Sequence, residues 1–279
     1  MLPLHPRRYV FRGHSSGVAA HIRRPQYRQL PVQGCSALPV TGGFHEMKLG
    51  PGQLDKWVSF EAVTTSARGD YVDPDEAVAT TRGEIPFDAA ASETRVTASV
   101  LGLVILGRVH IGHAAIGLTG RSPEGTAQPS IRLEGNVLEG VRIDDSRLKI
   151  TLAEQFYCEC DTRHKLATRH AAGLPPEHAR MFLPARSTDT ELTVFPEANG
   201  TVKCTVVQEI AWEGAPHATA RIHGHVVHVP NFGKIYFGEM FVNDHTRHLT
   251  MVRFQLGSND GGDVSAASGE TSGMPYPPI

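Results

Sequence analysis

Glycine and proline interrupt this chain so often that long helices have little room to form. The 279 residues include 28 Gly and 19 Pro, together 47 residues. This is a clearly larger share than the roughly 12% that the two residues contribute to average proteins. Between the breaks lie alternating, β-branched runs such as 57–65, which are typical of strands. Because short turns join neighbouring strands antiparallel, the sequence predicts a mainly β fold, either an antiparallel β-sandwich or a jelly-roll-like barrel.

One helical insertion is expected, at about 161–182. Asp161 suits an N-cap, and Gly173 suits the left-handed residue that ends a helix. A shorter helix is expected over 73–82, where an Asp-Pro pair precedes a stretch that ends at Gly83. The expected strands are 57–65, two within 94–119, 147–157, 191–195, 202–212, 218–229, 235–242 and 248–256.

The two ends of the chain lack the apolar periodicity of a packed element. Residues 1–56 are rich in Pro, Gly and Arg, and 257–279 are rich in Gly and Ser with a Pro-rich end. Such termini are usually loosely held. The sequence therefore predicts an extended basic arm over 1–56, a β-rich domain over 57–256 and a flexible tail over 257–279.

The net charge of −2 hides a strong asymmetry. The first 45 residues contain six arginines and no lysine or acid, which leaves 21 basic against 29 acidic residues in the remainder. Six charges spread over 28 residues are thinner than a dedicated nucleic-acid tail, although aromatic residues beside arginine suit stacking on bases. We expect the arm to lie on an acidic surface of its own or a neighbouring copy. Its candidate anion-binding residues are Arg7, Arg8, Arg12, Arg23, Arg24 and Arg28.

The pair His223 and His225 is the clearest candidate for a metal site. On a strand, residues two apart face the same side, so both imidazoles would reach one divalent transition metal. Enzymes of the cupin type place two histidines on a jelly-roll strand in this way. Such a site needs further ligands, and the candidates are His110, His113, His245 and His248.

Three weaker patterns have plain structural explanations. Residues 13–17 match G-x-S-x-G, but no α/β pattern surrounds them to form a nucleophile elbow. Cys158, Cys160 and His164 would give three zinc ligands, although reduced thiols that simply pack are the more ordinary reading. Apolar-Gly pairs recur every five residues over 101–117. This spacing suggests either a β-helix or glycine-rich strands that a second sheet approaches closely.

These observations favour a non-catalytic β-sandwich that acts through binding or self-assembly, with a homo-oligomer as the expected form. The alternatives are a cupin-like metal-dependent enzyme at His223 and His225, and a protein that binds nucleic acid or another anionic polymer through its arm. No apolar run reaches the roughly 18 residues of a membrane span, and the first residues lack the apolar segment of a secretion signal. We therefore expect a cytoplasmic location.

Overall fold

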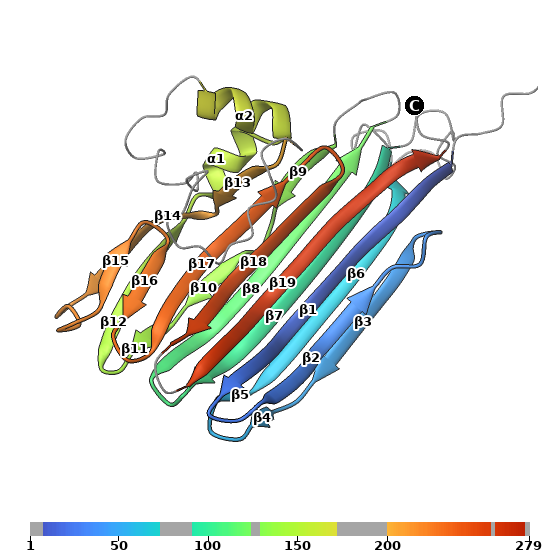
Figure 1. The fold of residues 1–279 in the computed structure, drawn as a ribbon. Helices are drawn as coiled ribbons and strands as arrows, with labels where there is room; N and C mark the ends of the chain where they lie inside the picture. Colours follow the sequence, from blue (N-terminus) through green and yellow to red (C-terminus); the bar gives the residue numbers. More distant parts are fainter. Residues whose placement is uncertain (1–7, 73–90, 124–128, 172–199, 258–259, 277–279) are drawn as a thin grey trace, which may run out of the picture.

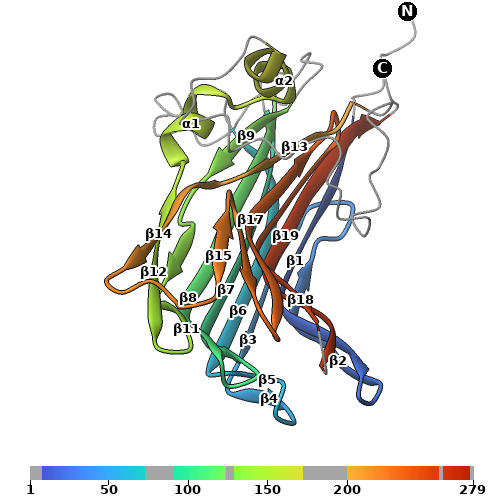
Figure 2. The same cartoon turned by 60° about the vertical axis from the view of Figure 1, so that its left-hand side comes forward.

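Long antiparallel strands dominate the computed structural model of the protein, which describes residues 8–72, 91–123, 129–171, 200–257 and 260–276. They form two sheets that stack face to face, seen from two directions in Figures 1 and 2. The β-sandwich expected from the sequence is thus confirmed. The four longest strands have 14 to 17 residues, which corresponds to about 50 Å of extended chain.

Sheet A has eight strands in the described residues, with its longest strands in the middle. In spatial order it contains β15 (Arg221–His223), β16 (Val226–Val229), β17 (Gly233–Val242), β18 (Thr246–Leu256), β19 (Gly261–Tyr276), β1 (Arg8–Arg24) and β2 (Arg28–Ala37), with β13 (Val202–Thr205) also paired to β17.

Sheet B has eleven strands in the same part of the chain. Its main path contains β14 (Val207–Glu213), β12 (Ser146–Leu152), β11 (Val141–Ile143), β8 (Val109–Ser122), β7 (Ala91–Ile105), β5 (Val58–Phe60) and β4 (Gly52–Leu54). Beside this path, β9 (Ser130–Leu133) and β10 (Val137–Glu139) pair with β8, and β6 (Ala62–Val72) pairs with both β7 and β3 (Gly43–Leu49).

Two short helices lie at one end of the sandwich (Figure 1). Helix α1 (Glu154–Glu159) replaces the end of the strand expected over 147–157, and α2 (Arg163–Ala171) begins the expected helical insertion. Thr162 accepts a hydrogen bond from the backbone N–H of Lys165, so it is the N-cap in place of Asp161. The expected helix over 73–82, the strand over 191–195 and the remainder of the insertion lie outside the described residues.

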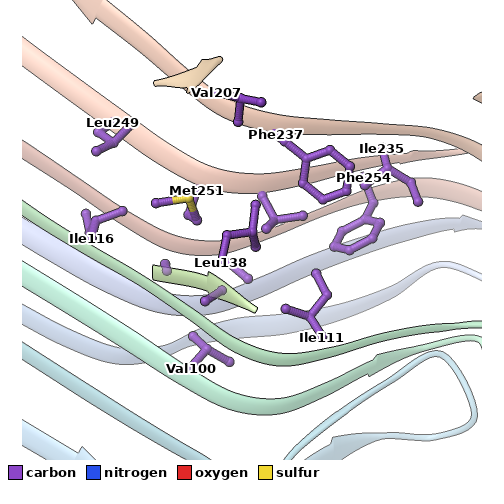
Figure 3. Packing of buried hydrophobic residues seen from close by; sticks show 14 of the residues in the cluster. Val100, Ile111, Ile116, Leu138, Val207, Ile235, Phe237, Leu249, Met251 and Phe254 are labelled. Atoms are coloured by element: carbon purple, nitrogen blue, oxygen red, sulfur yellow. The ribbon is translucent and has the colours of Figure 1, made fainter. Parts of the chain in front are cut away.

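The core lies between the two sheets. Strand β1 packs on β6 and β7, while β19 packs on β7 and β8. Apolar side chains from both layers interdigitate there (Figure 3), and their burial is the main stabilising contribution to such a fold. Fully buried examples are Val100, Ile111, Ile116, Ile235, Phe237, Leu249, Met251 and Phe254.

The expected N-terminal arm and C-terminal tail are wrong for the residues that the structure describes. Strands β1 and β19 are neighbours inside sheet A, paired from Arg8 with Tyr276 to Arg24 with Gly261. Their inward positions carry small residues such as Gly13 and Gly269. A Cβ at Gly13 would lie 2.8 Å from Cγ2 of Thr94, and one at Gly269 would lie 2.7 Å from Cδ1 of Ile116. The absence of a side chain therefore lets the sheets approach closely and also removes the apolar periodicity from the sequence.

The five-residue repeat over 101–117 belongs to an antiparallel hairpin, so the β-helix alternative is wrong. Strands β7 and β8 pair from Ile105 with Val109 outward. Residues 106–108 form the connection, in which Leu106 and Gly107 both have positive φ and the N–H of Arg108 bonds back to the carbonyl oxygen of Ile105, as in a tight reverse turn. The two strands expected within 94–119 are confirmed.

Candidate functional site

A local irregularity in β17 and β18 brings charged side chains together on the outer face of sheet A. Tyr236 and Glu239 are three residues apart, a spacing that puts side chains on opposite faces of a regular strand. Gly238 lies between them with a φ of +63°. On the neighbouring strand β18, Met251 and Val252 are consecutive and both fully buried, so the regular alternation of inward and outward side chains is interrupted there too. Glu239 therefore faces outward with Tyr236.

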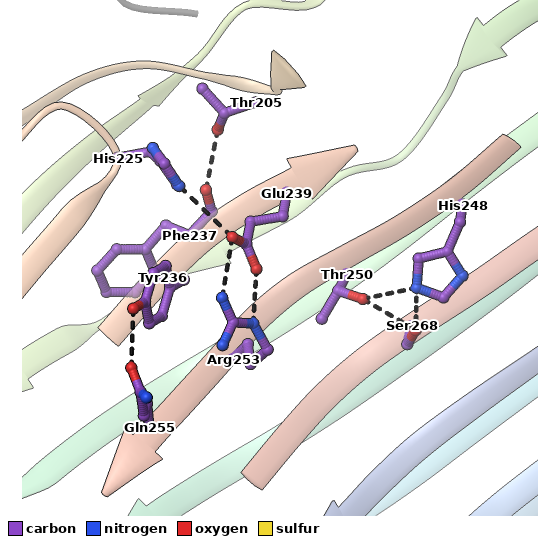
Figure 4. Close-up of polar contacts among 10 residues, drawn as sticks. All are labelled: Thr205, His225, Tyr236, Phe237, Glu239, His248, Thr250, Arg253, Gln255 and Ser268. Carbon is purple, nitrogen blue, oxygen red and sulfur yellow. Dashed lines mark hydrogen bonds and ion pairs between the residues drawn. The ribbon is translucent and has the colours of Figure 1, made fainter. Parts of the chain in front are cut away.

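Glu239 and Arg253 form a nearly enclosed ion pair on this face (Figure 4). The Nε of Arg253 donates to one carboxylate oxygen at 2.7 Å and its Nη2 donates to the other at 3.1 Å, while the carboxylate is only 3% exposed. The guanidinium lies 3.8 Å from the ring centroid of Tyr236, whose hydroxyl donates to Gln255 at 2.9 Å. The two parallel hydrogen bonds and the stacking on the ring together fix the position and orientation of the Arg253 guanidinium.

The imidazole of His225 lies above the same carboxylate, with its Nε2 3.6 Å from Oε1 of Glu239. This distance exceeds a hydrogen bond, and the buried nitrogen has no hydrogen-bond partner among the described residues. Burial by itself would raise the pKa of Glu239, but the facing imidazole and the guanidinium of Arg253 outweigh it and lower that pKa. The carboxylate is therefore held ionised by its neighbours, which leaves it poorly suited to act as a general base.

A second polar group occupies neighbouring rows of the same face. The Nε2 of His248 lies 3.0 Å from the hydroxyl of Thr250 and 3.4 Å from that of Ser268. Its Nδ1 is 3.7 Å from Glu270, whose pKa this contact lowers. Activation of a hydroxyl needs the carboxylate and the imidazole within hydrogen-bond reach, and the two hydroxyls already bond each other at 3.1 Å. We interpret the group as a cross-strand polar ladder.

The two histidines predicted to bind metal do not share a strand face. His223 ends β15 and pairs with Val226 at the start of β16, while Gly224, with a φ of +58°, and His225 form the hairpin turn between them. The strand geometry assumed from the sequence is therefore wrong, because a glycine in the left-handed region reverses the chain there. Within the described ranges no three His, Cys, Asp or Glu side chains come together as metal ligands, so metal binding stays a prediction.

The cysteines are all free thiols in the structure. Cys35 and Cys158 are exposed, whereas Cys160 and Cys204 are buried. Burial raises the pKa of the Cys204 thiol to about 12, which keeps it protonated and unreactive. Its Sγ lies 3.7 Å from the carbonyl oxygen of Met240, in keeping with the packing interpretation.

The arginines assigned to the basic arm are spread along β1, the turn after it and the start of β2. Arg23 pairs with Asp263 at 2.8 Å, and the Nε of Arg28 lies 3.7 Å from Asp55. Part of the expected attraction between the basic N-terminal residues and acids elsewhere in the chain is thus present within one molecule. Arg12 is exposed on the outer face of sheet A, Arg24 ends β1, Arg8 begins it, and Arg7 lies outside the described residues.

Sequence reasoning missed Glu239 and Arg253. They are 14 residues apart and belong to no motif, and their contact depends on how β17 pairs with β18. The local signal is Gly238 inside a largely apolar strand, a position that often marks a bulge.

The comparisons with known proteins place the chain in a family. A family model described as a domain of unknown function (DUF8256) matches residues 9–172 and 162–243. The chain belongs to this family. In this DUF8256 protein the matched ranges contain Glu239, whereas β18 and β19, with Arg253, follow them. No curated protein and no solved structure matches the chain.

This DUF8256 protein also has an open edge, which we define as residues 27–49. It contains β2, at one margin of sheet A, and β3, which pairs with β6 alone in the part of the chain that the structure describes. Four of the five large apolar side chains that the structure exposes lie here, each 49% to 65% exposed. They are Tyr27, Val32, Val40 and Phe44.

No helix within the described ranges combines the length and the apolar character that crossing a membrane requires.

Proposed function

We propose that this protein is a non-catalytic β-sandwich that acts by self-assembly, two copies joining through the open edge at β3. The observation that carries the proposal is the character of β3 itself. All seven of its residues pair with β6 on one side, and five of them are exposed. An edge strand that leaves its outer N–H and C=O groups unpaired is a template for a strand of another chain.

The charge pattern of β3 favours a second copy as the partner. Glu46 and Lys48 lie on its outward face and contact each other at 2.9 Å. In an antiparallel pairing of two β3 strands centred on Met47, Glu46 of each copy faces Lys48 of the other. Opposite charges directly across a strand pair are stabilising, and this contact is self-complementary, as a two-fold interface requires.

The apolar side chains of the open edge support the same arrangement. In that register Phe44 faces Gly50 of the other copy, where no atom lies close enough to obstruct the ring. Joining two sheets edge to edge also shields exposed apolar side chains from water, which is favourable. Self-assembly thus remains the leading function, but its surface is β3 and not a basic N-terminal arm.

The metal-dependent enzyme is the less favoured function. It depended on His223 and His225 sharing a strand face, and they lie on either side of a turn residue. Binding of nucleic acid through the arm is also less favoured. It assumed a free N-terminal arm, whereas residues 8–24 form an inner strand of sheet A.

Charge reversal within β3 tests self-assembly. Sedimentation equilibrium of the wild type should give a concentration-dependent dimer. Glu46→Lys and Lys48→Glu should each weaken that dimer at least tenfold, because like charges then face each other at two positions. The double variant Glu46→Lys/Lys48→Glu should restore it, and an equimolar mixture of the two single variants should form a heterodimer.

The matched control is Arg68→Glu, which reverses an exposed charge on β6, away from the unpaired side of β3, and should leave the dimer intact. A wild type that stays monomeric at every concentration would overturn the proposal. So would a dimer that is equally strong in all β3 variants.

A further inference from the structure

A groove on the outer face of sheet B, open to solvent on one side, offers a space of about 510 Å³. It lies where β7, β8, β11, β12 and β14 run side by side. Gly102, Gly112 and Gly140 leave part of its lining without side chains, while Val104 supplies apolar surface. Its volume is within the roughly 300–1,000 Å³ typical of sites for small ligands.

Two arginines meet directly across the strands that line this groove. Arg142 of β11 is the register partner of Arg147 of β12, and on its other side it faces His110 of β8. Both arginines are exposed. Like charges directly opposite each other destabilise a strand pair, so this arrangement is unfavourable unless something neutralises it.

No described residue bonds to either of these two guanidinium groups. Neither Arg142 nor Arg147 forms a hydrogen bond or ion pair with the described residues, although Glu213 is the register partner of Arg147. The contrast with Arg108 is local, since Arg108 donates two hydrogen bonds, at 2.9 and 2.7 Å, to Asp144 in the turn of the same hairpin. Asp144, an acid in the turn of this hairpin, therefore already pairs with Arg108.

We propose that this groove binds a phosphate monoester, whose phosphate lies between Arg142 and Arg147. Each guanidinium presents a planar fork of N–H donors. A carboxylate matches one fork with its two coplanar oxygens, whereas a phosphate monoester has three terminal oxygens and more negative charge, so it can accept from both forks at once. The chemistry of the paired arginines therefore favours the tetrahedral anion.

The rest of the groove suits a hydroxylated body attached to that phosphate. Glu61 lies over Gly102, where the missing side chain gives its carboxylate room, and Glu213 lines the groove beside Arg147. Carboxylates accept hydrogen bonds from ligand hydroxyl groups. A free inorganic phosphate would leave most of the space empty, so a phosphate ester of a small polyol fits better.

Isothermal titration calorimetry with glycerol 3-phosphate and with inorganic phosphate tests this site on the full-length protein. We expect saturable binding of one glycerol 3-phosphate per chain, tighter than inorganic phosphate, and no binding of glycerol. Arg142→Gln and Arg147→Gln should each weaken binding at least tenfold, because each removes charge-assisted hydrogen bonds. Arg142→Lys should weaken it less, since it keeps the charge and loses the fork.

The matched control is Arg221→Gln, which removes an exposed positive charge from β15 in the other sheet and should leave the affinity unchanged. Circular dichroism and thermal unfolding show whether each variant is folded. The proposal is overturned if the wild type binds neither ligand at millimolar concentration, or if folded Arg142→Gln and Arg147→Gln bind as tightly as the wild type. Glu46→Lys, which breaks the proposed dimer, should leave this binding intact, so the two proposals fail independently.

Discussion

Arg253 and Arg142 lie on the outer faces of the two sheets, in opposite electrostatic situations. Arg253 is bonded through two nitrogens to a buried carboxylate and covers a tyrosine ring. Arg142 faces a second arginine and has no partner among the described residues. The difference separates a charge that the fold itself satisfies from one that is left for a ligand, although both look alike in the sequence.

The largest effect should follow from breaking the pair in sheet A. Arg253→Met leaves the carboxylate of Glu239 buried without its partner, so we expect a loss of about 3–5 kcal/mol in the free energy of unfolding. Replacing both, in Glu239→Leu/Arg253→Met, should recover much of that loss because no unpaired charge remains. Urea denaturation of the single and double variants measures this, and a single-variant loss below about 1 kcal/mol would contradict the assigned role.

Acid should destabilise the protein through carboxylates that are held ionised. Hydrogen bonds from Arg108, assisted by His217, lower the pKa of Asp144 to about 2, whereas an unfolded aspartate titrates near 3.9. A lowered folded-state pKa means that the stability is fully present above about pH 4 and is lost as the pH falls toward about 2. Urea midpoints from pH 6 to pH 2 should therefore fall less steeply for Asp144→Asn, and parallel curves would exclude this contribution.

A smaller effect is expected where Arg253 covers the ring of Tyr236. Tyr236→Leu keeps an apolar side chain and removes the π face under the guanidinium, at a cost of about 1–2 kcal/mol for a partly desolvated pair. Tyr236→Phe keeps the ring face and removes the hydroxyl, which donates to Gln255, so it should cost less. Equal losses in thermal or urea unfolding would show that the ring face contributes nothing.

The smallest effect should have the opposite sign. Arg142→Gln removes one of two like charges that face each other, so we expect the ligand-free protein to become more stable by about 0.2–1 kcal/mol. The gain should shrink as salt is added, because salt screens exposed charges. A destabilised variant in phosphate-free buffer would mean that Arg142 has an internal role comparable to that of Arg253.

The limits of sequence-based prediction are clearest at β1 and in the β15–β16 turn. The run 57–65 is recognisable as a strand by its alternation and 235–242 by its largely apolar residues, whereas β1 buries Gly13 and Ser15 and has neither signal. In the turn, His223 and His225 look like one strand face until Gly224 adopts its positive φ. Small inward residues and left-handed glycines are therefore the points at which local patterns mislead.

The sequence by itself determined the class of fold and several of its strands, because turn residues and apolar alternation act over a few neighbouring residues. Only the tertiary structure decided that the chain ends pair inside sheet A, that Glu239 meets Arg253 and that Arg142 opposes Arg147. These contacts depend on strand register, which packing over the whole sandwich sets and no short segment encodes.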